Sequence, residues 1–127
     1  MATSKILICD DEEGIRESLK LILGDDHNLI TVDSGEMALQ ALSHSKEIKV
    51  MLLDIKMPST DGFDVLRWIR NQPRFAKLCV VMITSSDEIR DMNLAYKLGA
   101  NSFLVKPLDF WNAAEPSRSL ERLLARC

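Results

Sequence analysis

Short runs of apolar residues alternate along the chain with longer amphipathic segments. The run over residues 50–54 lacks the in/out alternation of a half-solvated strand, which is typical of a strand covered on both faces. Five such runs predict strands, at residues 5–9, 28–32, 50–54, 78–83 and 102–105. Apolar residues at helical spacing predict a helix after each of the first four. Strict alternation of strand and helix indicates one parallel sheet with helices on both faces.

Local signals predict where these helices begin and end. Gly24 follows the first helix and Gly99 the fourth, at positions where a C-terminal cap favours a positive φ. Asp33 and Ser85 each stand three residues before a glutamate, which is the spacing of a capping box. We therefore expect Asp33 to cap the second helix and not to bind a ligand, and Ser85 to cap the fourth.

The apolar stripes of two helices predict their buried side chains. For the second helix these are Met37, Ala38, Ala41 and Leu42, and for the fourth they are Ile89, Met92, Ala95 and Tyr96. Each stripe is expected to pack against the sheet.

The segment after residue 108 keeps a helical stripe that Pro116 interrupts. Proline lacks an N–H donor, and its ring crowds the carbonyl four residues before it. Two alternatives stay open: a fifth helix kinked at Pro116, or a loop over residues 108–115 and a shorter helix that begins at Pro116. We favour the second.

Composition and charge narrow the functional classes. With 127 residues, 46% of them hydrophobic, the chain has the size of one domain. The net charge is −3 and no dense run of Lys or Arg is present, which argues against direct nucleic-acid binding. No apolar stretch approaches the ~20 residues of a membrane span, and no signal peptide is visible. We expect a cytoplasmic protein with no membrane partner.

Four of the predicted strands end on polar residues that could carry chemistry. These residues are Asp10 and Asp11, Asp54, Thr84 and Lys106. In the doubly wound strand order 2-1-3-4-5, the carboxyl ends of these strands are neighbours, and ligands bind at that edge. Each residue by itself is more often a cap or a surface charge. Their coincidence at one edge indicates a site.

The three aspartates in this set predict a metal ion. Carboxylates that lie close together repel, and each resists ionisation unless a cation is present. Oxygen ligands without His or Cys favour a hard ion, and Mg²⁺ is the expected one. A carboxylate beside Mg²⁺ is a competent nucleophile toward phosphorus, which makes Asp54 the candidate phosphoryl acceptor. Lys106 and the Thr84 hydroxyl would neutralise the phosphoryl oxygens.

Four separated motifs resemble the receiver domain of bacterial two-component response regulators. They are D-D-E-E at 10–13, L-L-D-I-K-M-P-S-T-D-G at 52–62, M-I-T-S-S at 82–86 and G-A-N-S-F-L-V-K-P at 99–107. The likeness covers about residues 4–110, in order and at the family's spacing. It implies a flavodoxin-like fold, one receiver domain over residues 1–127 with no output domain in this chain, and no enzymatic activity beyond slow self-catalysed phosphorylation and dephosphorylation.

The resemblance also implies roles for individual residues. Asp54 would be phosphorylated by a histidine kinase or a phosphotransfer protein. Mg²⁺ would be held by Asp11, Asp54 and the Lys56 carbonyl, with Asp10 acting mainly through water. Thr84 would contact the phosphoryl group.

A switch is implied as well, through the aromatic residue three positions before the lysine. When the Thr84 hydroxyl moves to the phosphoryl group, the Phe103 ring would turn into the space it leaves, and the surface beside it would change shape. Further partners implied by the family are a downstream protein or output domain and a phosphorylation-linked homodimer.

Three other functions fit the sequence less well. A Mg²⁺-dependent phosphohydrolase of the haloacid-dehalogenase type needs a second Asp two residues after the nucleophile, where this chain has Lys56. Flavin binding would need a Ser/Thr-rich phosphate loop where the acidic residues 10–13 stand. A degenerate receiver used as a scaffold is disfavoured, because none of the five site positions is lost.

Overall fold

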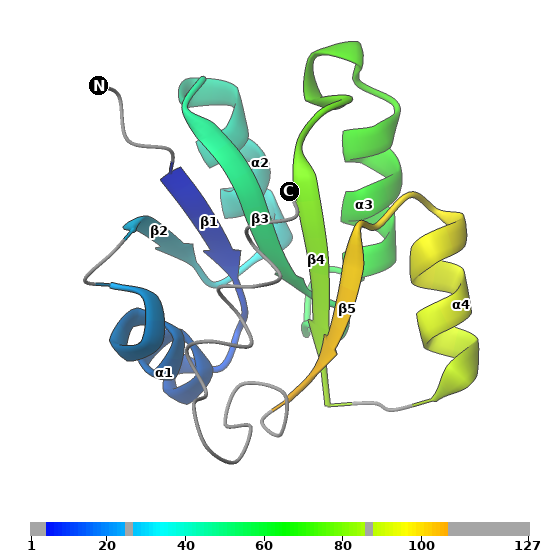
Figure 1. Cartoon of the computed structure of the whole chain (residues 1–127), viewed down its shortest axis with the longest axis horizontal. Helices are drawn as coiled ribbons and strands as arrows, with labels where there is room; N and C mark the ends of the chain where they lie inside the picture. Colours follow the sequence, from blue (N-terminus) through cyan, green and yellow to red (C-terminus); the bar gives the residue numbers. More distant parts are fainter. Residues whose placement is uncertain (1–4, 25–26, 86–87, 107–127) are drawn as a thin grey trace.

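Five parallel strands form one sheet in the order β2-β1-β3-β4-β5, as Figure 1 shows. The computed structural model describes residues 5–24, 27–85 and 88–106. The strands are β1 (Lys5–Cys9), β2 (Asn28–Val32), β3 (Ile48–Asp54), β4 (Cys79–Thr84) and β5 (Ser102–Val105). The doubly wound, flavodoxin-like sheet predicted from the alternation of elements is confirmed.

Helices cover both faces of the sheet. They are α1 (Glu13–Leu23), α2 (Gly35–His44), α3 (Gly62–Arg70) and α4 (Ile89–Lys97), with a 3₁₀ turn η1 (Pro73–Phe75) after α3. α1 packs on one face, and α2, α3 and α4 pack on the other (Figure 1). The predictions for residues 108–115 and Pro116 lie outside the described residues.

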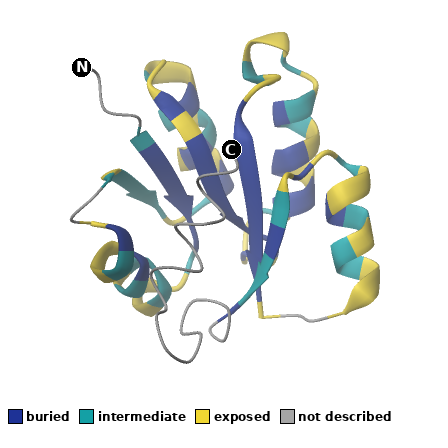
Figure 2. Cartoon of the chain, viewed as in Figure 1, coloured by how far each residue is buried: buried dark blue, intermediate teal, exposed yellow. Residues whose placement is uncertain are grey.

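The core consists of two apolar layers, one on each face of the sheet. Along β3, Met51 and Leu53 belong to the layer under α2, α3 and α4, whereas Val50 and Leu52 belong to the layer under α1. Side chains alternate between faces along a strand, so a strand with helices on both sides needs apolar residues at consecutive positions. Figure 2 shows the resulting burial of β3 and β4. This explains the unbroken apolar runs.

The strand register brings the carboxyl ends of four strands to one edge. Cys9 at the end of β1 pairs with Leu53, and Asp54 pairs with Ile83. On the far side, Thr84 pairs with Val105. The residues that leave β1, β3, β4 and β5 therefore emerge side by side.

Both capping-box predictions, for α2 and for α4, are wrong. α2 is capped by Ser34, whose Oγ accepts a hydrogen bond from the Met37 N–H at 3.2 Å. Asp33 lies one residue outside, since Ser34 is already extended and the helix begins directly after it. α4 begins at Ile89, so Ser85 does not cap it.

Of the two glycine predictions, the one for Gly24 is wrong and the one for Gly99 is confirmed. Gly24 has φ −62°, in the right-handed helical region, and its N–H donates to the Lys20 carbonyl at 2.7 Å. Gly99 has φ +103°. Its N–H bonds to the Tyr96 carbonyl, and the next N–H bonds to Ala95, which closes a Schellman motif.

The predicted helix stripes are confirmed only in part. Ala38, Leu42 and Ala95 are buried. Met37 and Tyr96 are each 47% exposed, because each is next in sequence to a buried alanine and successive helical residues point about 100° apart. Ile89, the first residue of α4, is 73% exposed.

The edges of the sheet are β2 and β5, which have five and four residues. β2 is only half-buried along its length, in contrast to β3 and β4. None of the helices within the described ranges is long and apolar enough to cross a membrane.

Candidate functional site

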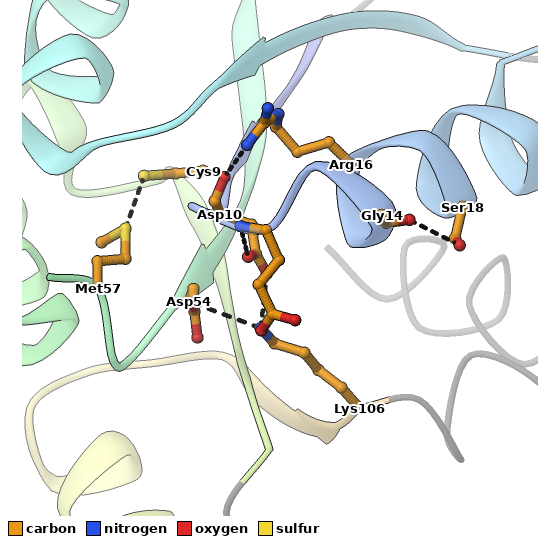
Figure 3. A network of polar contacts seen from close by, with 9 residues as sticks. Cys9, Asp10, Gly14, Arg16, Ser18, Asp54, Met57 and Lys106 are labelled. Atoms are coloured by element: carbon orange, nitrogen blue, oxygen red, sulfur yellow. Dashed lines mark hydrogen bonds and ion pairs between the residues drawn. The ribbon is translucent and has the colours of Figure 1, made fainter.

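Three charged side chains meet at the carboxyl edge of the sheet. Asp54 is the last residue of β3, Asp10 follows β1, and Lys106 follows β5. Lys106 Nζ lies 2.9 Å from Asp10 Oδ2 and 3.4 Å from Asp54 Oδ2 (Figure 3). Asp10 is 0% exposed and Asp54 2% exposed, so these charges interact away from bulk water.

Backbone hydrogen bonds fix the positions of these residues. The Asp10 N–H donates to the Val32 carbonyl at 3.1 Å, and the Lys106 N–H donates to the Thr84 carbonyl at 2.7 Å. The Asp10 side chain is held as well, since its Oδ1 accepts from the Glu12 N–H at 2.9 Å. The sheet therefore places the carboxylates and the ammonium group before any ligand binds.

A cluster of carboxylates at this edge could hold a cation. Asp10, Asp11, Glu12 and Asp54 each offer one oxygen, and these four oxygens all lie within 4.8 Å of one another. The buried Oδ2 atoms of Asp10 and Asp54 are close enough to Lys106 for ion pairs, yet neither accepts an aligned hydrogen bond. An all-oxygen set with unsatisfied buried acceptors fits a hard divalent ion such as Mg²⁺.

Burial is the main influence on the pKa of each of the two buried aspartates. Burial raises the pKa of Asp54 to about 7, and the charge of Asp10 acts in the same direction. Burial also raises the pKa of Asp10, against the opposing effect of Lys106. Both shifts mean that a cation in this cluster would compete with protons for the carboxylates.

Lys106 stays charged despite its burial. Burial by itself lowers the pKa of a lysine, but the hydrogen bond to Glu12 and the contact with Asp10 outweigh it, so the pKa of Lys106 is raised. The ammonium group is therefore a fixed positive charge beside Asp54.

The loop that leaves β3 closes tightly against Asp54. The Gly62 N–H donates to the Ile55 carbonyl at 2.7 Å, and Lys56 forms an isolated antiparallel bridge with Asp61. Asp61 also caps α3, since its Oδ1 accepts from the Phe63 N–H at 2.8 Å. The turn is narrow enough that Gly62 lies directly against the backbone of Asp54.

The remaining sequence candidates lie around this centre. Asp11 is half-buried, within the carboxylate cluster. The Lys56 side chain is exposed in the loop after β3. Thr84 is 0% exposed at the end of β4, and Phe103 is 8% exposed on β5. Met82, which pairs with Phe103, stands two residues before Thr84, so Thr84 and Phe103 share one face of the sheet.

The sequence analysis assigned no role to two residues that lie in the site, Glu12 and Arg16. Glu12 Oε1 accepts a hydrogen bond from Lys106 Nζ at 2.9 Å. Arg16 Nη1 donates to the Asp10 carbonyl at 2.8 Å (Figure 3). The D-D-E-E motif was a signal for Glu12, but its contact depends on Lys106, which lies 94 residues later in the chain.

Curated relatives and solved structures match the chain over most of its length. The transcriptional regulatory protein GltR of Pseudomonas aeruginosa is 36% identical over 103 residues, which cover 80% of this chain and 42% of GltR. The chemotaxis protein CheY1 of Helicobacter pylori is 29% identical over 105 residues, covering 81% of this chain and 85% of CheY1. The chain thus spans less than half the length of some relatives and most of others.

Solved structures agree with the fold. A response regulator receiver protein from Pseudomonas putida superposes with a TM-score of 0.86 at 27% identity, covering 100% of this chain and 99% of that one. The chemotaxis protein CheY4 of Vibrio cholerae gives 0.85 at 25% identity, covering 98% of both. The family model of the response regulator receiver domain matches residues 6–114. The chain therefore belongs to the receiver domains of response regulators, which are signalling domains.

Proposed function

We propose that this receiver domain is a phosphorylation-activated switch in which Asp54 accepts a phosphoryl group from a histidine kinase or a phosphotransfer protein. The observation that carries the proposal is the buried contact of Asp54 with Lys106 inside a cluster of carboxylates. A carboxylate held beside a fixed positive charge can attack phosphorus while that charge neutralises the phosphoryl oxygens.

The carboxylate cluster fits Mg²⁺, and Asp10, Asp11 and Asp54 are the residues that would hold it, with the Lys56 carbonyl as a further oxygen ligand. When bound, Mg²⁺ neutralises charge on the phosphoryl oxygens and lets the anionic phosphodonor approach. Glu12 extends the cluster on its exposed side.

Three side chains take part in the phosphoryl transfer: Asp54 as the acceptor, and Lys106 and Thr84 as hydrogen-bond donors. A carboxylate oxygen of Asp54 forms the new bond to phosphorus, and the bond from phosphorus to the donor's leaving nitrogen breaks, with the electron pair leaving on that nitrogen. Lys106 supplies an N–H donor to a phosphoryl oxygen, and the Thr84 hydroxyl supplies another. The product is an acyl phosphate, which this domain hydrolyses slowly; it is not a turnover enzyme.

Acetyl phosphate with Mg²⁺ should add one phosphoryl group to the protein, and Asp54→Asn should abolish this gain, because an amide is no nucleophile toward phosphorus. Intact mass spectrometry measures the gain. Asp64→Asn, which removes an exposed carboxylate on α3, is the matched control and should behave as the parent protein. Addition of EDTA should suppress the gain in the parent.

Two results would contradict the proposal. An equal mass gain in Asp54→Asn would place the phosphoryl group elsewhere. Rapid, continuous release of inorganic phosphate by the parent would instead support the phosphohydrolase alternative.

We propose that the conformational change caused by phosphorylation passes from Thr84 to Phe103. Both residues are buried and face the side of the sheet that α2, α3 and α4 cover. Movement of the Thr84 hydroxyl toward the phosphoryl group would leave space that the Phe103 ring can fill, and β5 contacts α4, so the surface around α4 would change.

Thr84→Ala should separate phosphorylation from switching. Asp54 should still gain a phosphoryl group, more slowly, because one hydrogen-bond donor is lost, but the Phe103 ring should no longer change its environment on phosphorylation. NMR signals of ¹³C-labelled phenylalanine rings report that environment. Thr31→Ala, on the edge strand β2, is the control. A full Phe103 response in Thr84→Ala would refute the coupling.

Signalling requires a partner that binds the surface around α4 and distinguishes its two conformations. We propose a downstream protein or output domain for that role, together with a homodimer that forms on phosphorylation, in the cytoplasm and without direct contact to nucleic acid or membrane. The single-domain assignment of residues 1–127 is part of this proposal.

A further inference from the structure

The Lys106 ammonium group is shared among three carboxylates. Its Nζ lies 2.9 Å from Glu12 Oε1, 2.9 Å from Asp10 Oδ2 and 3.4 Å from Asp54 Oδ2. Only the contact with Glu12 has the alignment of a hydrogen bond; the two aspartate oxygens accept none. In this state of the site, one N–H of the ammonium group is directed at Glu12.

The three carboxylates differ in their freedom to move. The side chain of Asp10 is 0% exposed and that of Asp54 is 2% exposed, whereas that of Glu12 is 57% exposed. The backbone of Glu12 is fixed as the N-cap of α1, where its carbonyl accepts from Ile15 and Arg16. Only its side chain can leave without disturbing the fold.

The number of donors limits what Lys106 can bind at once. An ammonium group has three N–H donors, and the one that is aligned in a hydrogen bond here is directed at Glu12. A phosphoryl oxygen on Asp54 needs one of these donors. Asp10 and Asp54 are buried, so the exposed carboxylate of Glu12 is the one that an incoming phosphoryl oxygen can displace.

We propose that Glu12 is a positioning residue that restrains the Lys106 ammonium group in the resting domain, and that an incoming phosphoryl group displaces the Glu12 carboxylate. This inference rests on the proposed function and deepens it, since it names the contact that must break before Lys106 can engage the phosphoryl group. Glu12 also places one more negative charge at the entrance, which disfavours anionic phosphodonors.

Two substitutions test the contact. Glu12→Gln removes the charge and weakens the hydrogen bond, and Glu12→Asp keeps the charge but shortens the side chain, so that it recedes from Lys106. If the contact restrains Lys106, both variants should react faster with acetyl phosphate, by about two- to fivefold, the factor expected for loss of one exposed ion pair. Glu13→Gln, which removes the neighbouring exposed charge in the first turn of α1, should match the parent.

A binding measurement that involves no turnover provides the second readout. Beryllofluoride with Mg²⁺ mimics the phosphoryl group on an aspartate, and calorimetry should show it binding both Glu12 variants about two- to fivefold more tightly than the parent. Circular dichroism confirms that each variant is folded.

The outcomes distinguish the inference from the proposed function. A parent that is phosphorylated on Asp54, with Glu12 variants that show parental rates and beryllofluoride affinities, overturns the role of Glu12 and leaves the function intact. If Glu12→Gln gains but Glu12→Asp matches the parent, charge alone acts and the restraining contact is refuted. A parent that neither gains a phosphoryl group nor binds beryllofluoride overturns both.

Discussion

Gly62→Ala should destabilise the domain by about 2–3 kcal/mol, the range for adding an atom to a site that cannot expand. A Cβ on Gly62 would overlap the carbonyl oxygen of Asp54 and lie 2.7 Å from Ile55 Cα. Both are backbone atoms of the segment that carries the proposed phosphoryl acceptor, so the clash cannot be relieved by rotating a side chain. Urea unfolding measures the change in the free energy of unfolding.

Gly14→Ala is the matched control for this substitution. Gly14 lies in α1, and a Cβ there would have no atom within 4 Å. Alanine is favoured over glycine in a helix, so this variant should be more stable than the parent by about 0.5–1 kcal/mol. Equal stability of Gly62→Ala and the parent would show that the turn after β3 has room to relax.

Arg70→Ala should cost about 2–3 kcal/mol, because one guanidinium group joins three separate segments. Its Nε donates to the Gly99 carbonyl, Nη1 to the Phe75 carbonyl, and Nη2 to the Leu78 carbonyl and Asn101 Oδ1, at 2.9–3.1 Å. Hydrogen bonds from a charged group contribute about 1.5–3 kcal/mol, and alanine leaves these acceptors without their partner. Thermal or urea unfolding detects the loss.

Arg67→Ala, on the same helix, is the comparison. Arg67 makes an exposed ion pair with Asp64 at 2.7 Å, which contributes at most about 0.5 kcal/mol. Arg70→Lys should restore little of the loss, since a single ammonium group cannot reach acceptors that a planar guanidinium spans. If the alanine variants at 67 and 70 were equally stable, the multiple contacts of Arg70 would contribute nothing.

The sheet and its order could be predicted from the sequence because burial on both faces leaves an unmistakable pattern. β3 and β4 are apolar at successive positions, and polar residues begin where these strands end. The convergence of Asp10, Asp54 and Lys106 then followed from the topology alone, since parallel strands place their carboxyl ends at one edge.

Features that depend on single turns or on distant partners could not be predicted in this way. Asp33 and Ser34 are both good caps, and only the backbone conformation selects Ser34. The contact of Glu12 with Lys106 and that of Arg70 with Asn101 join residues 94 and 31 positions apart. Spacing along the chain carries no signal for such pairs.

The two edge strands of the sheet affect how readily the free protein aggregates. A strand at a margin presents unpaired N–H and C=O groups to which a strand of another molecule can add. Here the edge strands β2 and β5 have only five and four residues, whereas the longer strands β3 and β4, which are mostly apolar, are enclosed between neighbours. The segments best suited to seeding fibrils are thus kept from intermolecular pairing for as long as the domain stays folded.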